Sequence, residues 1–258
     1  RVSGFIGAPL AGVLIAIIGP SNLLWLDVAS FLCSAALIGW AVPPTPPILQ
    51  RTQEDGEPEK TLARLWEGVR FIRRDAVILS ILVTVMITNL LDGALLAVVE
   101  PAYMRQVFHS ALPFGVIIAA FGGGTFVGTL IFGAVGHRLP RRLTLGVGFT
   151  LAGAIRFWIL LIPLFPILVA VNVVAGLLGG GINPLIRTLL QERVPSHMRA
   201  RVFGTTTAGV LIGVPLGAFL SGYVVIWMGI EATLLAMGII YFLATASLLM
   251  NAALKKMP

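Results

Sequence analysis

Charged residues are scarce in this sequence, and it contains a single cysteine. Asp, Glu, Lys and Arg make up 11% of the 258 residues, whereas hydrophobic residues make up 57%. A soluble domain carries roughly a quarter charged residues. A chain this apolar has too few charged residues to cover a surface that faces water. We therefore expect the lipid bilayer to be its solvent. The lone Cys33 excludes a disulfide framework and a cysteine-based metal site within this sequence.

Histidine is also sparse, and its positions carry no metal signal. His109, His137 and His197 fall between apolar runs, and no pair has metal-ligand spacing on a shared helix. We therefore expect neither a metal nor a cofactor. The net charge of +7 would suggest nucleic-acid binding in a soluble protein. Here the basic residues stand in short gaps between apolar runs, where membrane topology explains them better, so we expect no nucleic-acid partner.

Long apolar runs are the main feature that the sequence does contain. A bilayer core about 30 Å thick requires roughly 20 apolar residues of helix. Strands of a membrane β-barrel would be shorter and would alternate in polarity, unlike these continuous runs. The sequence therefore predicts an all-α integral membrane protein with about eight transmembrane helices. The expected spans are residues 3–19, 22–43, 76–98, 112–136, 143–163, 165–190, 202–228 and 230–253.

The gaps between the expected spans differ sharply in charge. One group comprises both ends of the chain, the connectors 44–75 and 137–142, and the end of the sixth span through Arg201, and it holds sixteen of the eighteen Lys and Arg residues. The other group holds only Arg105, and Arg156 lies inside the fifth span. Basic connectors stay on the cytoplasmic side. We therefore expect a multi-pass protein of the bacterial inner (plasma) membrane with both ends of this chain in the cytoplasm.

The connector 44–75 contains two different segments. Residues 43–60 are rich in proline and charge, which is typical of a flexible linker. The second segment has apolar residues at helical spacing with basic residues between them, which predicts an amphipathic helix suited to an anionic inner leaflet. A calmodulin-type target helix and a plain extension of the next span are the alternatives. The apolar positions are Leu62, Leu65, Trp66, Val69 and Ile72.

Three short motifs lie at defined places between or within the spans. The first, in the first span, combines glycines with a proline. The second and third are basic and lie in the connectors after the fourth and sixth spans. Their marker residues are Gly4, Gly7, Pro9 and Gly12 in the first motif, Gly133, Arg138, Arg141 and Arg142 in the second, and Arg199 and Arg201 in the third.

Together these motifs resemble the major facilitator superfamily (MFS), in its bacterial drug-exporter branch of Tap-like multidrug, macrolide-efflux and enterobactin exporters. The first motif resembles an antiporter motif, and the second resembles a gating loop motif. The resemblance implies that the eight spans correspond to helices 5–12 of a twelve-helix bundle, so that the N-terminal helices are lacking. Residues 1–43 would then be the last two helices of the N-terminal bundle, residues 44–75 a cytoplasmic linker with an amphipathic helix, and residues 76–258 the C-terminal six-helix bundle. The full-length protein would be a monomer.

Polar residues within the third span mark one candidate site. Thr88 and Asp92 share a helix face with Asn89 beside them, and Glu100 stands at the outer end of the span. A charge within a span is costly and tends to face a cavity or a partner. Asp92 is therefore either a group that binds a proton or a cationic substrate in a cavity wall, or a structural contact between helices.

Three further polar residues lie in the fifth and sixth spans. Arg156 is expected at a depth similar to that of Asp92, so an ion pair is possible, and a structural pairing is favoured over substrate contact. Asn172 and Asn183 fall on one face of the sixth span. That face could hydrogen-bond a substrate or pack against a neighbouring helix. We also expect a bend at the glycines 179–181.

These features favour a secondary active transporter that exports drugs or amphipathic small molecules by alternating access, coupled to protons. Its partners would be the lipid bilayer, a small-molecule substrate and protons. An enzyme is not expected, because no cluster of acids, histidines or a nucleophile stands at the membrane surface. Two alternatives remain: the membrane subunit of an ATP-driven exporter, for which no Walker motif is present in this sequence, or a nonfunctional fragment.

Overall fold

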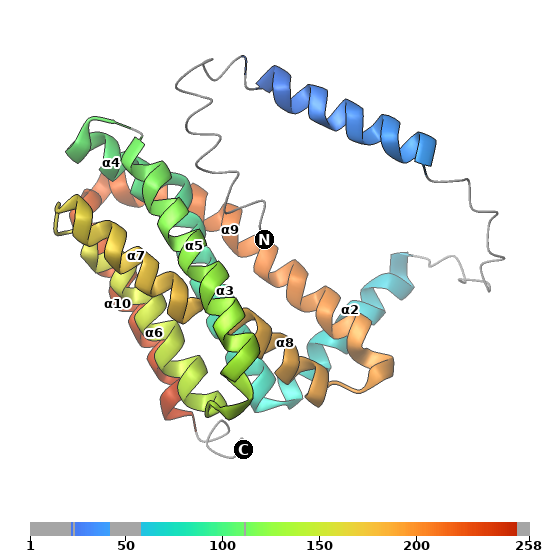
Figure 1. Ribbon diagram of the computed structural model, residues 1–258. Helices are drawn as coiled ribbons and strands as arrows, with labels where there is room; N and C mark the ends of the chain where they lie inside the picture. The colour runs from blue at the N-terminus through green and yellow to red at the C-terminus, as the bar shows by residue number, and fades with distance from the viewer. Residues whose placement is uncertain (1–21, 23, 42–57, 111, 252–258) are drawn as a thin grey trace.

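The protein is helical throughout the part of the chain that the structure describes. A computed structural model describes residues 22, 24–41, 58–110 and 112–251, and no strand occurs within these ranges (Figure 1). The first expected span, 3–19, and the first motif (Gly4, Gly7, Pro9 and Gly12) lie outside the described residues. The helices are Leu24–Ala41, α2 (Pro58–Arg74), α3 (Ala76–Ala94), α4 (Glu100–Phe108), α5 (Leu112–Val135), α6 (Arg141–Ile159), α7 (Phe165–Gly179), α8 (Ile182–Arg193), α9 (Arg199–Met228) and α10 (Ile230–Met250).

Six of the described helical segments are long and apolar enough to cross a membrane. They are Leu24–Ala41, α3 continued through α4, α5, α7 continued through α8, α9, and α10. Helix α6 is not among them, because arginines at both of its ends lower its apolar character, yet it packs between α7 and α10 within the bundle. The prediction of an all-α membrane protein is confirmed, and the count of eight spans is approximate.

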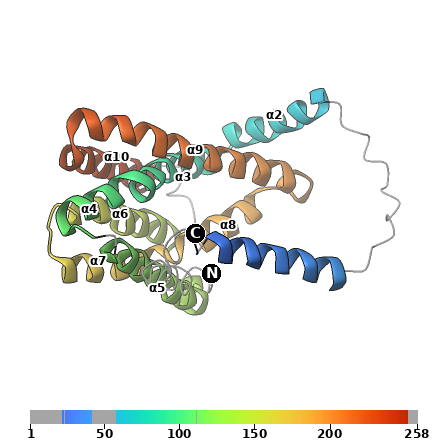
Figure 2. The same ribbon diagram turned by 90° about the horizontal axis from the view of Figure 1, so that it is seen from above.

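The bundle is a series of neighbouring helices. In the order α5, α7, α6, α10, α3 and α9, each helix packs against the next, and α2 packs against the first part of α9. Seen from above, α9 and α10 lie on one side of the bundle and α5 and α7 on the other (Figure 2). Large apolar side chains of α9, such as Ile212, Phe219 and Trp227, are exposed, as expected for a surface that faces lipid. Each described residue of helix Leu24–Ala41 is exposed as well.

Local sequence explains where several helices begin and end. The side chain of Asp75 accepts hydrogen bonds from the backbone N–H groups of Val77 (2.9 Å) and Ile78 (3.1 Å), which caps the start of α3. His109 adopts a left-handed conformation (φ 53°) and ends α4. Gly229, at φ 80°, makes the tight turn between α9 and α10, a conformation that glycine adopts without a steric penalty.

Small residues allow two helix pairs to approach closely. Gly128 of α5 and Gly176 of α7 face the backbone of the partner helix, and a Cβ at Gly128 would overlap the Leu177 carbonyl. Gly217 of α9 faces the Leu90 carbonyl of α3 in the same way. Packing of this kind holds membrane helices together where no hydrophobic driving force acts between them. Glycines of α5, α7 and α9 therefore serve close packing between helices.

The third span differs from expectation, whereas the sixth agrees with it. The third was expected to end at residue 98, but α3 continues through a π-helical turn (Leu95–Val99) into α4 and ends at Phe108. Glu100, placed by sequence at the outer end, is therefore inside the bundle. The expected bend in the sixth span is confirmed, because α7 ends at Gly179 and α8 begins at Ile182.

Candidate functional site

A buried ion pair joins α4 to α6. An Arg156 Nη2 atom lies 3.7 Å from Glu100 Oε2, and the two side chains are only 6% and 2% exposed. Arg156 stands in the last turn of α6, and Glu100 is the first residue of α4. The expectation that Arg156 is paired is confirmed. Its ion-pair partner is Glu100, however, and not Asp92 as the estimated depths suggested.

Two more helices supply partners for the Arg156 guanidinium. Its Nε donates a hydrogen bond to Asn172 Oδ1 of α7 (3.1 Å), and its central carbon lies 4.0 Å from the centre of the Phe121 ring of α5. Asn172 is held in place by a hydrogen bond from its Nδ2 to the Leu168 carbonyl (2.9 Å). A cation over an aromatic face is stabilised by the ring, most strongly where water is excluded. Side chains from three helices, α4, α5 and α7, therefore surround the guanidinium group that α6 carries.

Asp92 approaches the same cluster from α3. It is partly buried and interacts electrostatically with both Arg156 and Glu100. In an unbroken α-helix, residues 92 and 100 would point about 80° apart, because each residue turns by about 100°. The π-helical turn between them takes up one extra residue, which brings the two directions to within about 20°. The π-turn thus aligns both carboxyl groups with Arg156.

The cluster formed by Asp92, Glu100, Arg156 and Asn172 has an uneven charge balance, with two carboxyl groups and one guanidinium. It is electrically neutral when one carboxyl group carries a proton. A buried charge without compensation is costly. The second carboxyl group therefore favours the binding of one proton or one cation. In addition, Glu100 Oε2 is buried and has no hydrogen-bond partner among the described residues. The cluster therefore has the chemical means to bind one positive charge.

The other candidate residues of the third span contact protein. Thr88 is buried, its hydroxyl donates a hydrogen bond to the Val85 carbonyl (3.1 Å), and its side chain interacts with Tyr241 of α10. Asn89 is half-buried and donates from Nδ2 to the same carbonyl (2.8 Å). Contact between helices therefore describes Thr88, whereas the hydrogen bond of Asn89 stays within α3.

Asn183 does not belong to the cluster. It lies on α8, after the break in the sixth span, and it is exposed. Asn172 lies on α7, before the break, and is 2% exposed. The expectation that Asn172 and Asn183 share one face is therefore wrong. The interruption of the helix at residues 180–181 separates the two side chains.

Sequence reasoning did not identify Phe121 and Tyr241 as partners of these groups. Phe121 stands in an apolar run and is one of fourteen phenylalanines. Tyr241 likewise lies in an apolar helix, where it interacts with Thr88 and packs against Phe157 with ring centres 5.4 Å apart. No local signal marks either residue, because each is defined by a neighbour on another helix.

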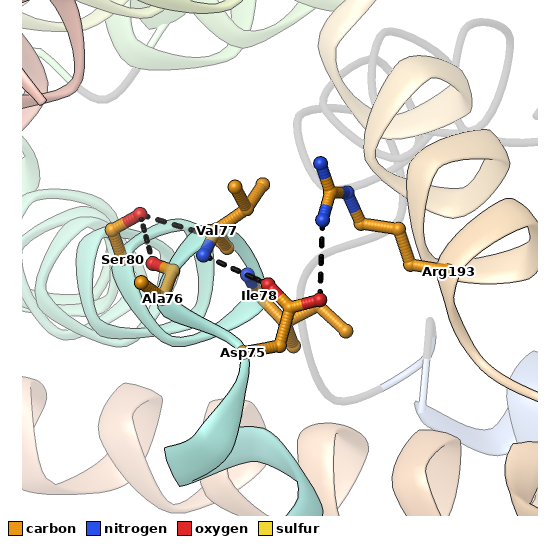
Figure 3. A network of polar contacts seen from close by, with 6 residues as sticks. All are labelled: Asp75, Ala76, Val77, Ile78, Ser80 and Arg193. Carbon is orange, nitrogen blue, oxygen red and sulfur yellow. Dashed lines mark hydrogen bonds and ion pairs between the residues drawn. The ribbon is translucent and has the colours of Figure 1, made fainter. Parts of the chain in front are cut away.

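The opposite end of the bundle, where the basic connectors lie, is joined by three ion pairs. Asp75 Oδ2 accepts from Arg193 of α8 at 3.2 Å while its other oxygen caps α3 (Figure 3). Arg141 of α6 pairs with Glu192, the neighbour of Arg193 in α8. Arg201 of α9 pairs with Glu67 of α2. The last turn of α8 thus connects α3 with α6.

The remaining arginines of the two basic motifs differ in their contacts. Arg142 donates to the Leu249 carbonyl of α10. Arg199 donates to the carbonyls of Val194 (3.2 Å) and Gln191 (2.9 Å), which otherwise lack partners at the end of α8. Such bonds are favourable at the negative end of a helix dipole. Arg138 is exposed.

Gly133, the first marker of the second motif, is exposed on α5, and a Cβ placed there would meet open space. No close contact therefore requires a glycine at this position within the described structure.

Two pockets lie away from the charge cluster. One, of about 360 Å³, lies between α4 and the α9–α10 turn, and its polar lining includes Tyr103, Gln106 and Glu231. The other, of about 380 Å³, lies between α3 and α10 near Ser80 and Asn251. Neither is lined by Arg156 or Glu100.

Comparison with known proteins agrees with this architecture. The family profile described as Major Facilitator Superfamily matches residues 82–256. The chain is 26% identical over 242 residues to the multidrug efflux pump Tap of Mycobacterium tuberculosis (strain ATCC 25618 / H37Rv), a match that covers 91% of this chain and 55% of that protein. The Tap pump of Mycolicibacterium fortuitum is 24% identical over 240 residues, with 91% and 56% covered.

A more distant relative matches a shorter part of the chain. The quinolone resistance protein NorA of Staphylococcus aureus (strain N315) is 25% identical over 125 residues, which covers 48% of this chain and 32% of that protein. The chain spans about half the length of the Tap relatives that it matches. With its all-helical membrane architecture and these matches, the chain belongs to the Major Facilitator Superfamily, in the branch that contains bacterial drug exporters.

Proposed function

We propose that these helices serve a proton-coupled exporter of amphipathic organic molecules in the bacterial inner membrane, with the basic end of the bundle in the cytoplasm. The observation that carries this proposal is the buried cluster of two carboxyl groups around Arg156. Membership of a transporter family and similarity to the multidrug efflux pump Tap and the quinolone resistance protein NorA support the substrate class. The active unit is a monomer.

Charge balance supplies the coupling step. With Arg156 ionised, the cluster is neutral when one proton is bound to Asp92 or Glu100. An organic cation that approaches from the cytoplasm neutralises the carboxylate in place of the proton, and the O–H proton leaves to water. After release of the cation on the outer side, a proton from that side binds the same carboxyl group. One proton therefore enters for each monovalent cation exported.

Asp92 is the carboxyl group best placed to meet a substrate. Glu100 is fully enclosed and has Arg156 at 3.7 Å, whereas Asp92 is only partly buried. Glu100 and Asn172 hold the guanidinium in position.

Alternating access requires the ion pairs at the basic end to separate when the cavity opens to the cytoplasm. These pairs are partly exposed, so breaking each of them costs no more than about 1 kcal/mol.

Efflux of ethidium tests the proposal. The native gene that encodes this chain is expressed in an efflux-deficient bacterium, and export is measured with and without a protonophore. We expect the protonophore to stop export, which also distinguishes this mechanism from an ATP-driven one. Asp92→Asn should reduce proton-driven export at least tenfold, whereas Glu231→Gln, at an exposed acid of α10, should leave it near the wild-type rate. Full proton-driven export by Asp92→Asn at equal expression would refute this role.

A further inference from the structure

Helix α2 has two faces with different surroundings. Gly68 and Ile72 are buried, and Gly68 lies against Thr205 and the Arg201 carbonyl of α9. At about 100° per residue, Trp66, Arg70 and Arg73 point to the opposite side. Trp66 is 67% exposed, although tryptophan is costly to leave in water. Of the apolar positions of the predicted amphipathic helix, Ile72 is buried and Trp66 is exposed.

The exposed side of α2 carries uncompensated positive charge. Arg70, Arg73 and Arg74 are exposed, and the structure shows no ion-pair partner for them among the described residues. The nearest acid along the helix, Glu67, is occupied by Arg201 of α9. Asp75, the next acid, is occupied by Arg193. Three guanidinium groups are therefore available to an anion.

These residues form a groove of suitable size for a phosphate headgroup. A pocket of about 520 Å³ is lined by the three arginines, by Trp66 and Val69, and by Glu67, which is paired with Arg201. Planar guanidinium groups match phosphate oxygens in pairs and do so better than an ammonium group. Tryptophan is enriched where headgroups meet the hydrocarbon.

The height of the groove relative to the membrane follows from the chain. Arg70 to Arg74 precede Ala76, the first residue of a 33-residue apolar helical segment, by two to six residues. At 1.5 Å per residue this is at most about 9 Å along a helix, which is comparable to the headgroup layer of about 5–8 Å on each side of the bilayer core. The groove therefore lies at the level of lipid phosphates.

We propose that this groove, formed by Trp66, Arg70, Arg73 and Arg74, binds the headgroup of an anionic phospholipid of the cytoplasmic leaflet. The bound lipid neutralises the exposed charge of α2 and fixes this helix against the membrane. Because α2 is attached to α9 through Gly68 and the Glu67–Arg201 pair, the lipid also steadies the basic end of α9.

Native mass spectrometry of the full chain tests the proposal. The protein in mild detergent is offered equal amounts of phosphatidylglycerol and phosphatidylcholine, and bound lipid is counted. We expect a preference for phosphatidylglycerol that falls about fivefold for each arginine removed, which corresponds to about 1 kcal/mol per basic residue near an anionic surface. Arg73→Gln should show a single such step, and the triple variant Arg70→Gln/Arg73→Gln/Arg74→Gln should lose the preference.

The following controls distinguish the effect of lost charge from structural damage, and a lipid site from a site for free anions. The triple lysine variant keeps the charge and should keep most of the preference, whereas Arg105→Gln, an exposed arginine of α4, should bind lipid as the wild type does. Inorganic phosphate at millimolar concentration should not displace the lipid. An unchanged preference in Arg73→Gln and in the triple glutamine variant would overturn the proposal, and displacement by phosphate would show a free-anion site instead. Loss of the preference in the Arg105→Gln control would also contradict it.

Discussion

Replacing Arg156 with methionine should destabilise the protein more than replacing Glu100 with glutamine. Arg156→Met removes the only cation of the cluster and leaves Glu100 buried at 2% exposure without a counter-charge. Glu100→Gln is milder, because the guanidinium keeps Asn172, the Phe121 ring and the attraction of Asp92. The two changes therefore test whether Arg156 is the common partner of both acids.

The size of the effect follows from the burial of the pair. Removal of one partner of a buried ion pair costs roughly 3–5 kcal/mol, and a lone charge at the centre of a membrane helix costs a similar roughly 2.5–3.5 kcal/mol. Both side chains are at most 6% exposed, so solvent screening does not reduce the value. For a chain of this length, about 2–4 °C per kcal/mol converts this cost into a fall in Tm on the order of 6–20 °C. Glu100→Gln should lower Tm by less than half of that amount.

Thermal unfolding in a mild detergent, followed by the helical circular dichroism signal, measures these differences. The double variant Arg156→Met/Glu100→Gln should unfold at a higher temperature than Arg156→Met alone, because the stranded carboxylate is gone. Glu231→Gln is the matched control for removal of an exposed acid. If Arg156→Met unfolds at the wild-type temperature, or if Glu100→Gln is the more damaging change, the assignment of Arg156 as the shared counter-ion is incorrect.

Two further predictions concern packing and helix capping. Gly176→Ala should cost about 1–3 kcal/mol because its Cβ would overlap the Phe121 carbonyl across the α5–α7 contact, whereas Gly122→Ala, with open space around its Cβ, should be neutral or slightly stabilising; equal Tm values for the two variants would contradict the packing. Asp75→Ala should cost about 1–2 kcal/mol because it removes the α3 cap as well as a partly exposed ion pair. Arg193→Gln and Asp75→Asn remove only the pair and should each cost at most about 1 kcal/mol, so a larger loss in Arg193→Gln would refute this division.

Hydropathy and charge predicted the architecture because they depend on composition over long segments. The runs that include α5, α9 and α10 need about 20 apolar residues to cross a bilayer, and their bounds agree with expectation to within a few residues. The bend in the sixth span was also predictable, since three consecutive glycines at 179–181 followed by Pro184 weaken a helix locally.

The sequence could not predict how the charges pair. Glu100-Pro101 ends an apolar run and is therefore typical of a span boundary. In the structure the helix continues, because the π-turn accommodates Pro101, which lacks a backbone N–H donor, and because Arg156 compensates the carboxylate. Arg156 and Glu100 are 56 positions apart on different helices, and no pattern within either helix encodes their contact. Pairing of this kind is decided by how the helices pack.

The two charged layers of the bundle are carried by the same helices, and this connects the cluster around Arg156 with the basic end. Helix α3 is capped by Asp75, which pairs with α8, and carries Asp92 nearly five turns later. Helix α6 begins at Arg141, which also pairs with α8, and carries Arg156 in its last turn. A helix transmits tilt along its axis because its backbone hydrogen bonds hold it rigid. If binding of a proton or a cation beside Arg156 shifts α3 against α6, the separation of Asp75 and Arg141, which α8 holds together, changes with it.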